Sequence, residues 1–542
     1  MSTTTSTRIK GTFTRQTSGL VRDLSLADAA WYGVFAAGSL YLFIYLFPFP
    51  QFSAPGVSMP LLVMFLLVYA LPIYYIYAVL GSAMPRAGGD YLYETRTISP
   101  LVGFVAPWAC ELLFWLTYPA SGGLVVAQFG VEPIFAVLGH TYHLHWCTSI
   151  ATWAGGKTGT FIITLLVVAG CWALTVARLK IYRMVQRWVL VPVTIIAVIC
   201  LYVIVFSAFG GNFAHTFDGA SGGVTTAAIA HAAVKAGYQG VGFSLGHTLL
   251  YVAPIGGIVA YAMFSAQGML GEVKNATNTR RLFGSFTIGG AFLAIFMLAV
   301  PLLLLTHVVG NRFLNEFAFA VSGGGVVTPY SANLSAFFAM LSPSPILTIF
   351  VSLGFMAAGF GIAMVVFLNS SRVMMAMSLD GAIPAVFSRV SERTHTPVIA
   401  VTIWAAAGAV VVTAFDWITN WQTPLLLAGT ITSVMILGFT SLAAALFPYR
   451  AKDIYRVAPG PVRRELLGVP VITIVGVIGT VLTVILTWIA LTYKPDGLVN
   501  GPARWTLLGA FVTGVIVYYG WRIRQRRRGI DAGLAFREIP PD

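Results

Sequence analysis

The sequence predicts an all-α integral membrane protein with twelve transmembrane helices. Of its 542 residues, 58% are hydrophobic and 9% are charged, whereas a soluble domain has about 25% charged residues. The mean hydropathy is +0.83. Apolar stretches of about 17–25 residues, the length that crosses a bilayer, recur along the whole chain. A third observation, the uneven distribution of positive charge between the connections, supports the same fold class.

The twelve apolar stretches follow one another with few long interruptions. They cover residues 27–47, 60–83, 101–126, 159–177, 186–209, 247–270, 284–308, 346–371, 398–415, 424–447, 470–492 and 503–521. Three connections, 127–158, 210–246 and 309–345, are longer and contain Gly, His, Ser and short apolar segments. An even number of spans places both termini on the same side of the membrane.

The positive charges distinguish the two sides. With these spans, 27 of the 32 Lys and Arg residues fall on the side of the termini. The other five fall on the opposite side: Lys157, Lys235, Arg312, Lys494 and Arg504. The positive-inside rule then predicts that both termini are cytoplasmic, with an N-terminal tail, 1–23, and a basic C-terminal tail, 522–542. We expect the protein in the plasma membrane. The net charge of +14 therefore indicates contact with anionic lipid, and we expect no nucleic-acid partner.

The sixth stretch is apolar but interrupted. Between Thr248 and Leu270 it contains Pro254, Gly256, Gly257 and Gly268. Unpaired peptide groups cost several kcal/mol in lipid, so a broken helix is tolerated there only where it faces protein or a cavity. Such breaks at mid-depth commonly form a ligand site. The alternative is a proline kink without a ligand, since Gly and Pro are common in membrane helices.

The first stretch has a similar interruption. It contains Gly33 and then the small residues Ala36, Ala37, Gly38 and Ser39, which let the backbone approach a ligand closely. The alternative is a small-residue packing face between helices. The two interrupted helices lie five spans apart, and breaks at corresponding positions in two halves indicate a substrate site.

Three segments at the ends of spans two, six and eight resemble signatures of the amino acid–polyamine–organocation (APC) transporters. They are PRAGGDYLY at 85–93, GEVKN at 271–275 and SRVMMAMSLDGAIP at 371–384. The resemblance covers about residues 24–490. It implies a core of ten helices, 24–450, arranged as a 5+5 inverted repeat of the leucine-transporter type. It also implies that helices 1 and 6 are unwound at the site and that two extra helices, within 451–521, lie outside the repeat. Taken singly, Gly88 and Gly89 are better interpreted as a simple loop turn.

The chain departs from this family at positions that matter for coupling. Phe264 stands where many members have an acidic residue, and Val193 stands where some proton-coupled members have lysine. The segment 360–368 contains no hydroxyl, whereas sodium-coupled relatives bind the ion with hydroxyls there. The sequence therefore shows neither coupling device.

Glu111 is the one acidic residue deep within an apolar stretch. An ionisable group in a membrane helix costs about 2.5–3.5 kcal/mol or more and is a functional candidate by default. We interpret Glu111 as a candidate for proton coupling, with a structural glutamate as the alternative. The H-x-x-H-x-H-x-C segment at 140–147 lies in a connection without fixed geometry, so we predict no metal and no cofactor.

The interpretation that follows is secondary active transport of amino acids, with no enzymatic activity. We expect the substrate carboxylate at N–H groups near Ala36, Ala37, Gly38 and Ser39, and its amino group at carbonyls between Val259 and Ala262. Tyr261 and Phe264 would line an apolar wall for a neutral side chain. Transport of polyamines or cationic amino acids, exchange, and a membrane receptor or sensor that binds without transport stay open as alternatives. Possible partners are the amino acid, protons and the bilayer.

Overall fold

The computed structural model describes residues 22–210, 213–220, 224–323, 325, 334–341, 344–418, 422–493, 501–527 and 536. Most of the predicted N-terminal tail and of the C-terminal tail lie outside the described residues. Within them, eleven helices are long and apolar enough to cross a membrane, or twelve when the bent pair Leu245–Ile255 and Gly257–Met263 is counted as one span. The predicted all-α membrane architecture is confirmed.

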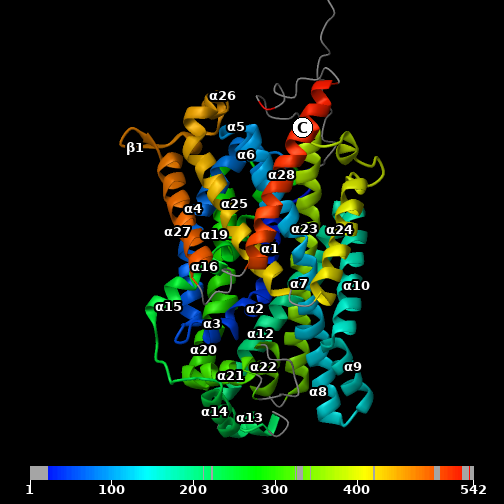
Figure 1. The fold of residues 1–542 in the computed structure, drawn as a ribbon, viewed down its shortest axis with the longest axis vertical. Helices are drawn as coiled ribbons and strands as arrows, with labels where there is room; N and C mark the ends of the chain where they lie inside the picture. The colour runs from blue at the N-terminus through cyan, green and yellow to red at the C-terminus, as the bar shows by residue number, and fades with distance from the viewer. Residues whose placement is uncertain are drawn as a thin grey trace, which may run out of the picture.

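The bundle is elongated, with its long helices along the longest axis (Figure 1). At one end, drawn uppermost, lie α5 (Gly89–Thr97), α26 (Lys452–Val457) and the last turns of α28 (Gly501–Arg527). We call this the basic end, because it carries the arginine-rich end of α28. Short helices of two connections cover the opposite end, drawn lowermost: α13 (Phe213–Ala220), α14 (Thr226–Lys235) and α21 (Asn311–Ser322).

The first half of the chain contains the following further elements: α1 (Leu26–Ala36), η1 (Ser39–Leu42), α2 (Phe43–Leu46), α3 (Phe49–Ser53), α4 (Met59–Ala83), α6 (Pro100–Pro107), η2 (Trp108–Leu113), α7 (Thr117–Val125), η3 (Val126–Val131), α8 (Glu132–Tyr142), α9 (His145–Gly155), α10 (Lys157–Val176), α11 (Leu179–Val185), η4 (Gln186–Leu190), α12 (Val191–Ser207) and η5 (Ala208–Gly210). Here η2, η3 and η4 are π-helical, whereas η1 and η5 are 3₁₀ turns.

The second half contains α15 (Leu245–Leu250), α16 (Val252–Ile255), α17 (Gly257–Ala260), η6 (Tyr261–Met263), α18 (Ser265–Gly268), η7 (Leu270–Glu272), α19 (Thr279–Ala291), η8 (Phe292–Ala299), α20 (Val300–Val309), α22 (Leu334–Leu341), α23 (Pro345–Leu379), η9 (Ala385–Ser388), α24 (Val398–Trp417), α25 (Gln422–Arg450), η10 (Gly460–Arg463) and α27 (Val471–Thr492). A two-residue hairpin joins β1 (Glu465–Leu466) to β2 (Val469–Pro470).

The third span is longer than the sequence predicts. It runs over Pro100–Tyr142, so the expectation of a connection from residue 127 onward is wrong. Gln128, Glu132 and Pro133 suggest a loop, but η3 carries the helix through them, and Pro133 falls in the first turn of α8, where its missing N–H costs little. Most of 127–158 is helical.

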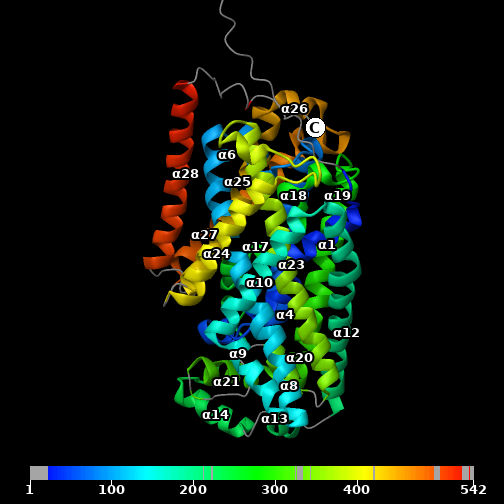
Figure 2. The ribbon, with the colours of Figure 1, turned by 90° about the vertical axis from the view of Figure 1, so that its right-hand side faces the viewer.

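The outer faces of the bundle are apolar. Large side chains such as Trp188, Ile288, Val410, Trp488 and Ile516 are each more than 60% exposed. Exposed apolar patches of this extent are unusual on a soluble protein and suit contact with lipid chains. Figure 2 shows α28 along one side of the bundle. The inverted repeat and the predicted domain boundaries stay predictions.

Candidate functional site

The first membrane helix is broken where its small residues lie. Ser25 starts α1 with a capping box, in which its hydroxyl accepts from the Asp28 N–H and Asp28 accepts from the Ser25 N–H. The helix ends at Ala36, and Gly38 and Ser39 then take positive φ of 101° and 48°. Glycine adopts such a conformation without strain. The chain continues within the bundle as the short elements η1 and α2.

The sixth span is broken as well. It bends by 53° between Leu245–Ile255 and Gly257–Met263, and then continues as the short elements α18 and η7. Pro254 and the two following glycine positions lie at the bend, so the predicted interruption is confirmed. A bend of this kind releases backbone groups from the regular helical pattern.

The two broken helices meet at the centre of the bundle. A Cβ atom placed on Gly33 of α1 would lie 1.9 Å from the carbonyl oxygen of Ala262 in η6. Only glycine allows this approach, because any side chain at Gly33 would overlap the helix-6 backbone. The structure thus brings together the two segments that the sequence analysis paired.

The predicted binding residues are all buried in this conformation. All eight are buried: Ala36, Ala37, Gly38, Ser39, Val259, Tyr261, Ala262 and Phe264. Both breaks are therefore covered by protein, and a ligand reaches them only after the bundle opens.

Several of the predicted binding groups already have hydrogen-bond partners. The Ala37 N–H donates to the Gly33 carbonyl over 2.8 Å, and the Gly38 N–H donates to the Phe35 carbonyl over 3.0 Å. On helix 6 the Val259 carbonyl accepts from the Tyr74 hydroxyl over 2.7 Å. In contrast, the fully buried Ser39 hydroxyl has no hydrogen-bond partner among the described residues. Ser39 therefore offers the unpaired polar group of the helix-1 break.

An aromatic cluster surrounds Phe264. Its ring stacks on Tyr32 at 6.0 Å between centroids and contacts the rings of Trp115 at 5.2 Å and Tyr261 at 5.4 Å. Tyr261 and Phe264, which the sequence predicts for an apolar wall, are in contact, and Tyr32 and Trp115 were not predicted beside them. The apolar sequences around Tyr32 and Trp115 do not indicate this contact, because it joins helices that are far apart in sequence.

Asn369 connects three helices next to the breaks. Its side-chain amide donates to the Phe264 carbonyl over 3.0 Å, and its oxygen accepts from the Tyr32 hydroxyl over 2.8 Å. Tyr32 also lies 2.7 Å from the Val365 carbonyl. Sequence reasoning missed Asn369, although a lone amide in a long apolar helix was a visible signal. It ties α1 and helix 6 to α23.

The three signature segments converge at the basic end. Glu272 and Arg372 form a fully buried ion pair with two hydrogen bonds of 3.0 and 3.1 Å. Arg96 lies 2.6 Å from Asp380, again without solvent exposure. Gly88 has φ of 104°, and its N–H donates to the Gly268 carbonyl over 3.4 Å. A Cβ placed on Gly88 would lie 2.3 Å from Ala376, and one placed on Gly271 would lie 3.0 Å from the Ala87 nitrogen, so the turn at Gly88 packs against the other two segments.

Glu111 lies in the π-helical turn η2 and is fully buried. Its carboxyl faces Asp90 of α5 within hydrogen-bond reach, and Glu94 is a further acidic neighbour. Neither Glu111 oxygen accepts a bond from an N–H or hydroxyl group among the described residues. Glu111 was predicted as a site and Asp90 and Glu94 were not, although their i, i+4 spacing is visible in the sequence.

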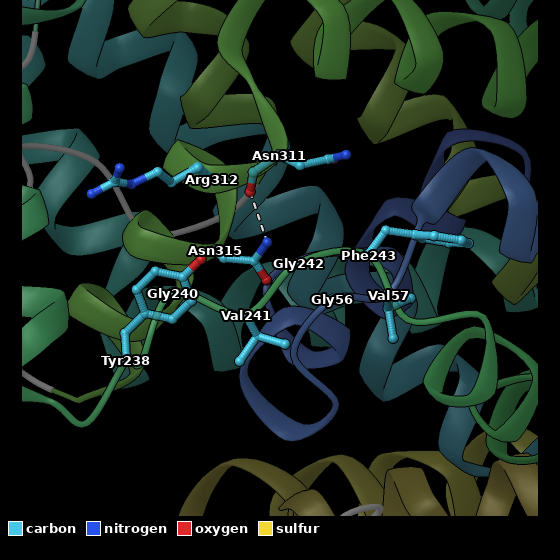
Figure 3. Close-up of a pocket in the computed structure, with 10 residues that line it drawn as sticks. All are labelled: Gly56, Val57, Tyr238, Gly240, Val241, Gly242, Phe243, Asn311, Arg312 and Asn315. Atoms are coloured by element: carbon cyan, nitrogen blue, oxygen red, sulfur yellow. Dashed lines mark hydrogen bonds between the residues drawn. The ribbon is translucent and has the colours of Figure 1, made fainter.

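A cavity of about 470 Å³ lies at the opposite end of the bundle, between residues 56–57, 238–243 and α21. Figure 3 shows Asn311 and Asn315 at this cavity, where the Asn315 amide donates to the Asn311 carbonyl over 2.7 Å. None of the predicted binding residues lines it. Within the described residues no group of three or more His, Cys, Asp or Glu side chains is placed to hold a metal ion.

Comparison with known proteins agrees with the geometry. The family model described as amino acid permease matches residues 30–517. The chain is 36% identical over 59 residues to the Asc-type amino acid transporter 1 of Homo sapiens, and equally similar to those of Mus musculus and Rattus norvegicus. Each of these alignments covers 11% of this chain and 11% of the relative.

Proposed function

Because the chain belongs to the amino acid permease family, we propose that it transports amino acids across the plasma membrane by alternating access. The observation that carries this proposal is the contact between the two broken helices at Gly33 and Ala262. Non-helical backbone buried at mid-depth is how secondary transporters form a substrate site. The positive-inside rule supports a cytoplasmic location for the basic end and for both termini.

The substrate would bind between the two breaks. Its carboxylate would take N–H groups of Ala37–Ser39 and the unpaired Ser39 hydroxyl, and its amino group would take carbonyls of Val259–Ala262. Since Ala37, Gly38 and Val259 already have partners, binding has to exchange these bonds. Each exchange costs little when a new bond replaces the old one, because a net hydrogen bond contributes about 1 kcal/mol.

The lining favours a neutral amino acid. Residues 33–42 and 256–266 contain no Asp, Glu, Lys or Arg, and Phe264 lies among Tyr32, Trp115 and Tyr261. A second positive charge moved into such a site needs a fixed acid or a complete aromatic cage to replace its hydration. Two acidic residues interact with helix 6: Asp90 accepts from the Gln267 amide over 2.6 Å, and Glu111 interacts with Tyr261.

The test is a ligand panel followed by uptake. Thermal melting of the purified protein with a library of amino acids and amines identifies ligands, because a ligand of the folded state raises stability by mass action. We expect leucine, phenylalanine or alanine to stabilise the protein and to enter proteoliposomes. Stronger competition by arginine, agmatine or putrescine would overturn the neutral assignment. Stabilisation without uptake would instead support a receptor or sensor.

A further inference from the structure

Three buried carboxyl groups form a cluster towards the basic end of the bundle. Asp90 and Glu94 lie one turn apart on α5, and Glu111 lies on η2. All three side chains are fully buried. We call Asp90, Glu94 and Glu111 the carboxyl cluster.

Among the described residues, three side chains form hydrogen bonds with the cluster as donors: Gln267, Thr440 and Tyr77, whose hydroxyl bonds to Asp90. Gln267 of α18 donates from Nε2 to Asp90 Oδ2 over 2.6 Å. The Thr440 hydroxyl of α25 lies 2.9 Å from Asp90 Oδ1 and 3.2 Å from Glu94 Oε1. Since a hydroxyl has one proton, Thr440 can donate to one of these oxygens at a time.

Several oxygen atoms of the cluster and of Gln267 have no hydrogen-bond donor in the described part of the chain. Glu94 Oε2, both Glu111 oxygens and Gln267 Oε1 are buried without a partner among the described residues. Gln267 Oε1 is an amide acceptor, so it needs a donor that the cluster could supply only as a protonated carboxyl. Asp90 and Glu111 face each other within hydrogen-bond reach, and two carboxylates can form that bond only with a shared proton.

Within the part of the chain that the structure describes, no cation compensates the three acids. Among the described residues, neither an arginine nor a lysine forms an ion pair with any of them. The other titratable groups that interact with the cluster are Tyr77, Tyr93, Tyr261 and Cys110. Charging several buried acids without a counter-ion is strongly unfavourable. The three carboxyls also do not converge as metal ligands would, among the residues described.

The electrostatics of α5 agree with a bound proton. Burial and then the charge of Asp90 raise the pKa of Glu94 well above its ordinary value. Burial also raises the pKa of Asp90, although hydrogen bonds from its neighbours act in the opposite direction. Burial of this kind favours the protonated form of a carboxyl over the carboxylate.

We propose that the carboxyl cluster is a proton-binding site that couples proton movement to the helix-6 break through Gln267. This inference rests on the proposed transport function and names its driving ion. Gln267 follows Phe264 by three residues on the same broken helix, and Gly89 packs against its backbone, 2.1 Å from a Cβ placed on the glycine. Opening of the basic end moves α18 away from α5 and α25. That movement removes a donor from Asp90, admits water and lets the proton exchange with the cytoplasm.

Infrared difference spectroscopy tests the proton site without transport. A protonated carboxyl has a C=O stretching band that a carboxylate lacks, and ester-free detergent avoids overlap with lipid. We expect this band near neutral pH in the wild type, and its loss or shift in the isosteric variants Asp90→Asn, Glu94→Gln and Glu111→Gln. Asp416→Asn, at the far end of α24, is the matched control and should keep the band. A wild type without the band, or variants with an unchanged band, would overturn the site.

Proteoliposome uptake tests the coupling. With the membrane potential clamped at zero, a one-unit pH gradient drives up to about tenfold accumulation for one proton per amino acid. We expect accumulation by the wild type and by Asp416→Asn, and simple equilibration by Glu111→Gln with counterflow still measurable. Accumulation by Glu111→Gln equal to that of the wild type, or accumulation driven by sodium, would refute the coupling. Absence of counterflow in the wild type would refute transport itself, and the infrared result would still decide the proton site.

Discussion

Replacing Gly33 with alanine adds one methyl group at the contact between the two broken helices and should push them apart. The new methyl group would lie 1.9 Å from the Ala262 carbonyl oxygen, 2.6 Å from its carbon and 3.0 Å from its Cα. The shortest usual carbon–oxygen contact is about 3.3 Å. Helices 1 and 6 must therefore move apart by about 1.4 Å, or one of them must rotate.

The expected magnitude follows from overpacking. An extra methylene in a tight core typically costs about 1–3 kcal/mol. If that cost falls on the conformation in which the breaks meet, its population decreases by about 5- to 150-fold. Uptake should decrease by the same order. Helix propensity acts in the opposite direction, since alanine is favoured over glycine by about 1 kcal/mol in a helix interior.

A matched variant isolates the contact. Gly284 lies within α19, and a Cβ placed there meets no atom within 4 Å. Gly284→Ala therefore gains helix propensity without overlap and should melt at or above the wild-type temperature with normal uptake. Gly33→Ala should melt at a lower temperature and lose most of its uptake. Equal melting temperatures and equal uptake of the two variants would refute the proposed approach of helices 1 and 6.

Four further expectations follow from the same structure. Gly38→Trp should abolish uptake while the protein still purifies as a monodisperse species, because Gly38 has positive φ and a side chain there would fill the break; normal uptake would place the site elsewhere. Asn369→Leu should lower thermal stability by about 1–3 kcal/mol, the cost of leaving the buried Phe264 carbonyl without its donor; unchanged melting would show that this bond is dispensable. Replacing sodium with choline should leave uptake unchanged, since residues 360–368 contain no hydroxyl; strict sodium dependence would contradict this. Because the pKa of Glu94 is raised in the folded protein, stability should fall as pH rises from the ordinary carboxyl pKa through the raised one, and Glu94→Gln should flatten that slope in melting curves; an equally steep slope in the variant would count against it.

The breaks could be predicted because their causes are local. Positive φ at Gly38 and the Pro254–Gly257 bend both depend on residues that the chain itself displays. The number of spans follows from hydropathy for the same reason. The end of the third span could not be placed, because the π-helical turn η3 absorbs residues that read as a loop.

The surroundings of the site depend on contacts between distant segments. Gln267 reaches Asp90 and Thr440 reaches Glu94 only after three helices, α5, α18 and α25, have packed. Of the carboxyl cluster, only Glu111 was predicted as a site, because the i, i+4 spacing of Asp90 and Glu94 does not show which residues they face. Asn369 differs from these residues because its role could have been predicted: one amide in an apolar helix already indicates a buried hydrogen bond.

Counterflow tests the central claim most directly, because it measures movement of the substrate without a driving gradient or a known coupling ion. Liposomes containing the wild type or Gly38→Trp are loaded with a neutral amino acid that stabilises the protein and are then diluted into labelled amino acid. We predict transient accumulation of label by the wild type and none by Gly38→Trp. A wild type that binds its ligand and shows no counterflow would contradict transport, and equal counterflow in both would contradict a site at the helix-1 break.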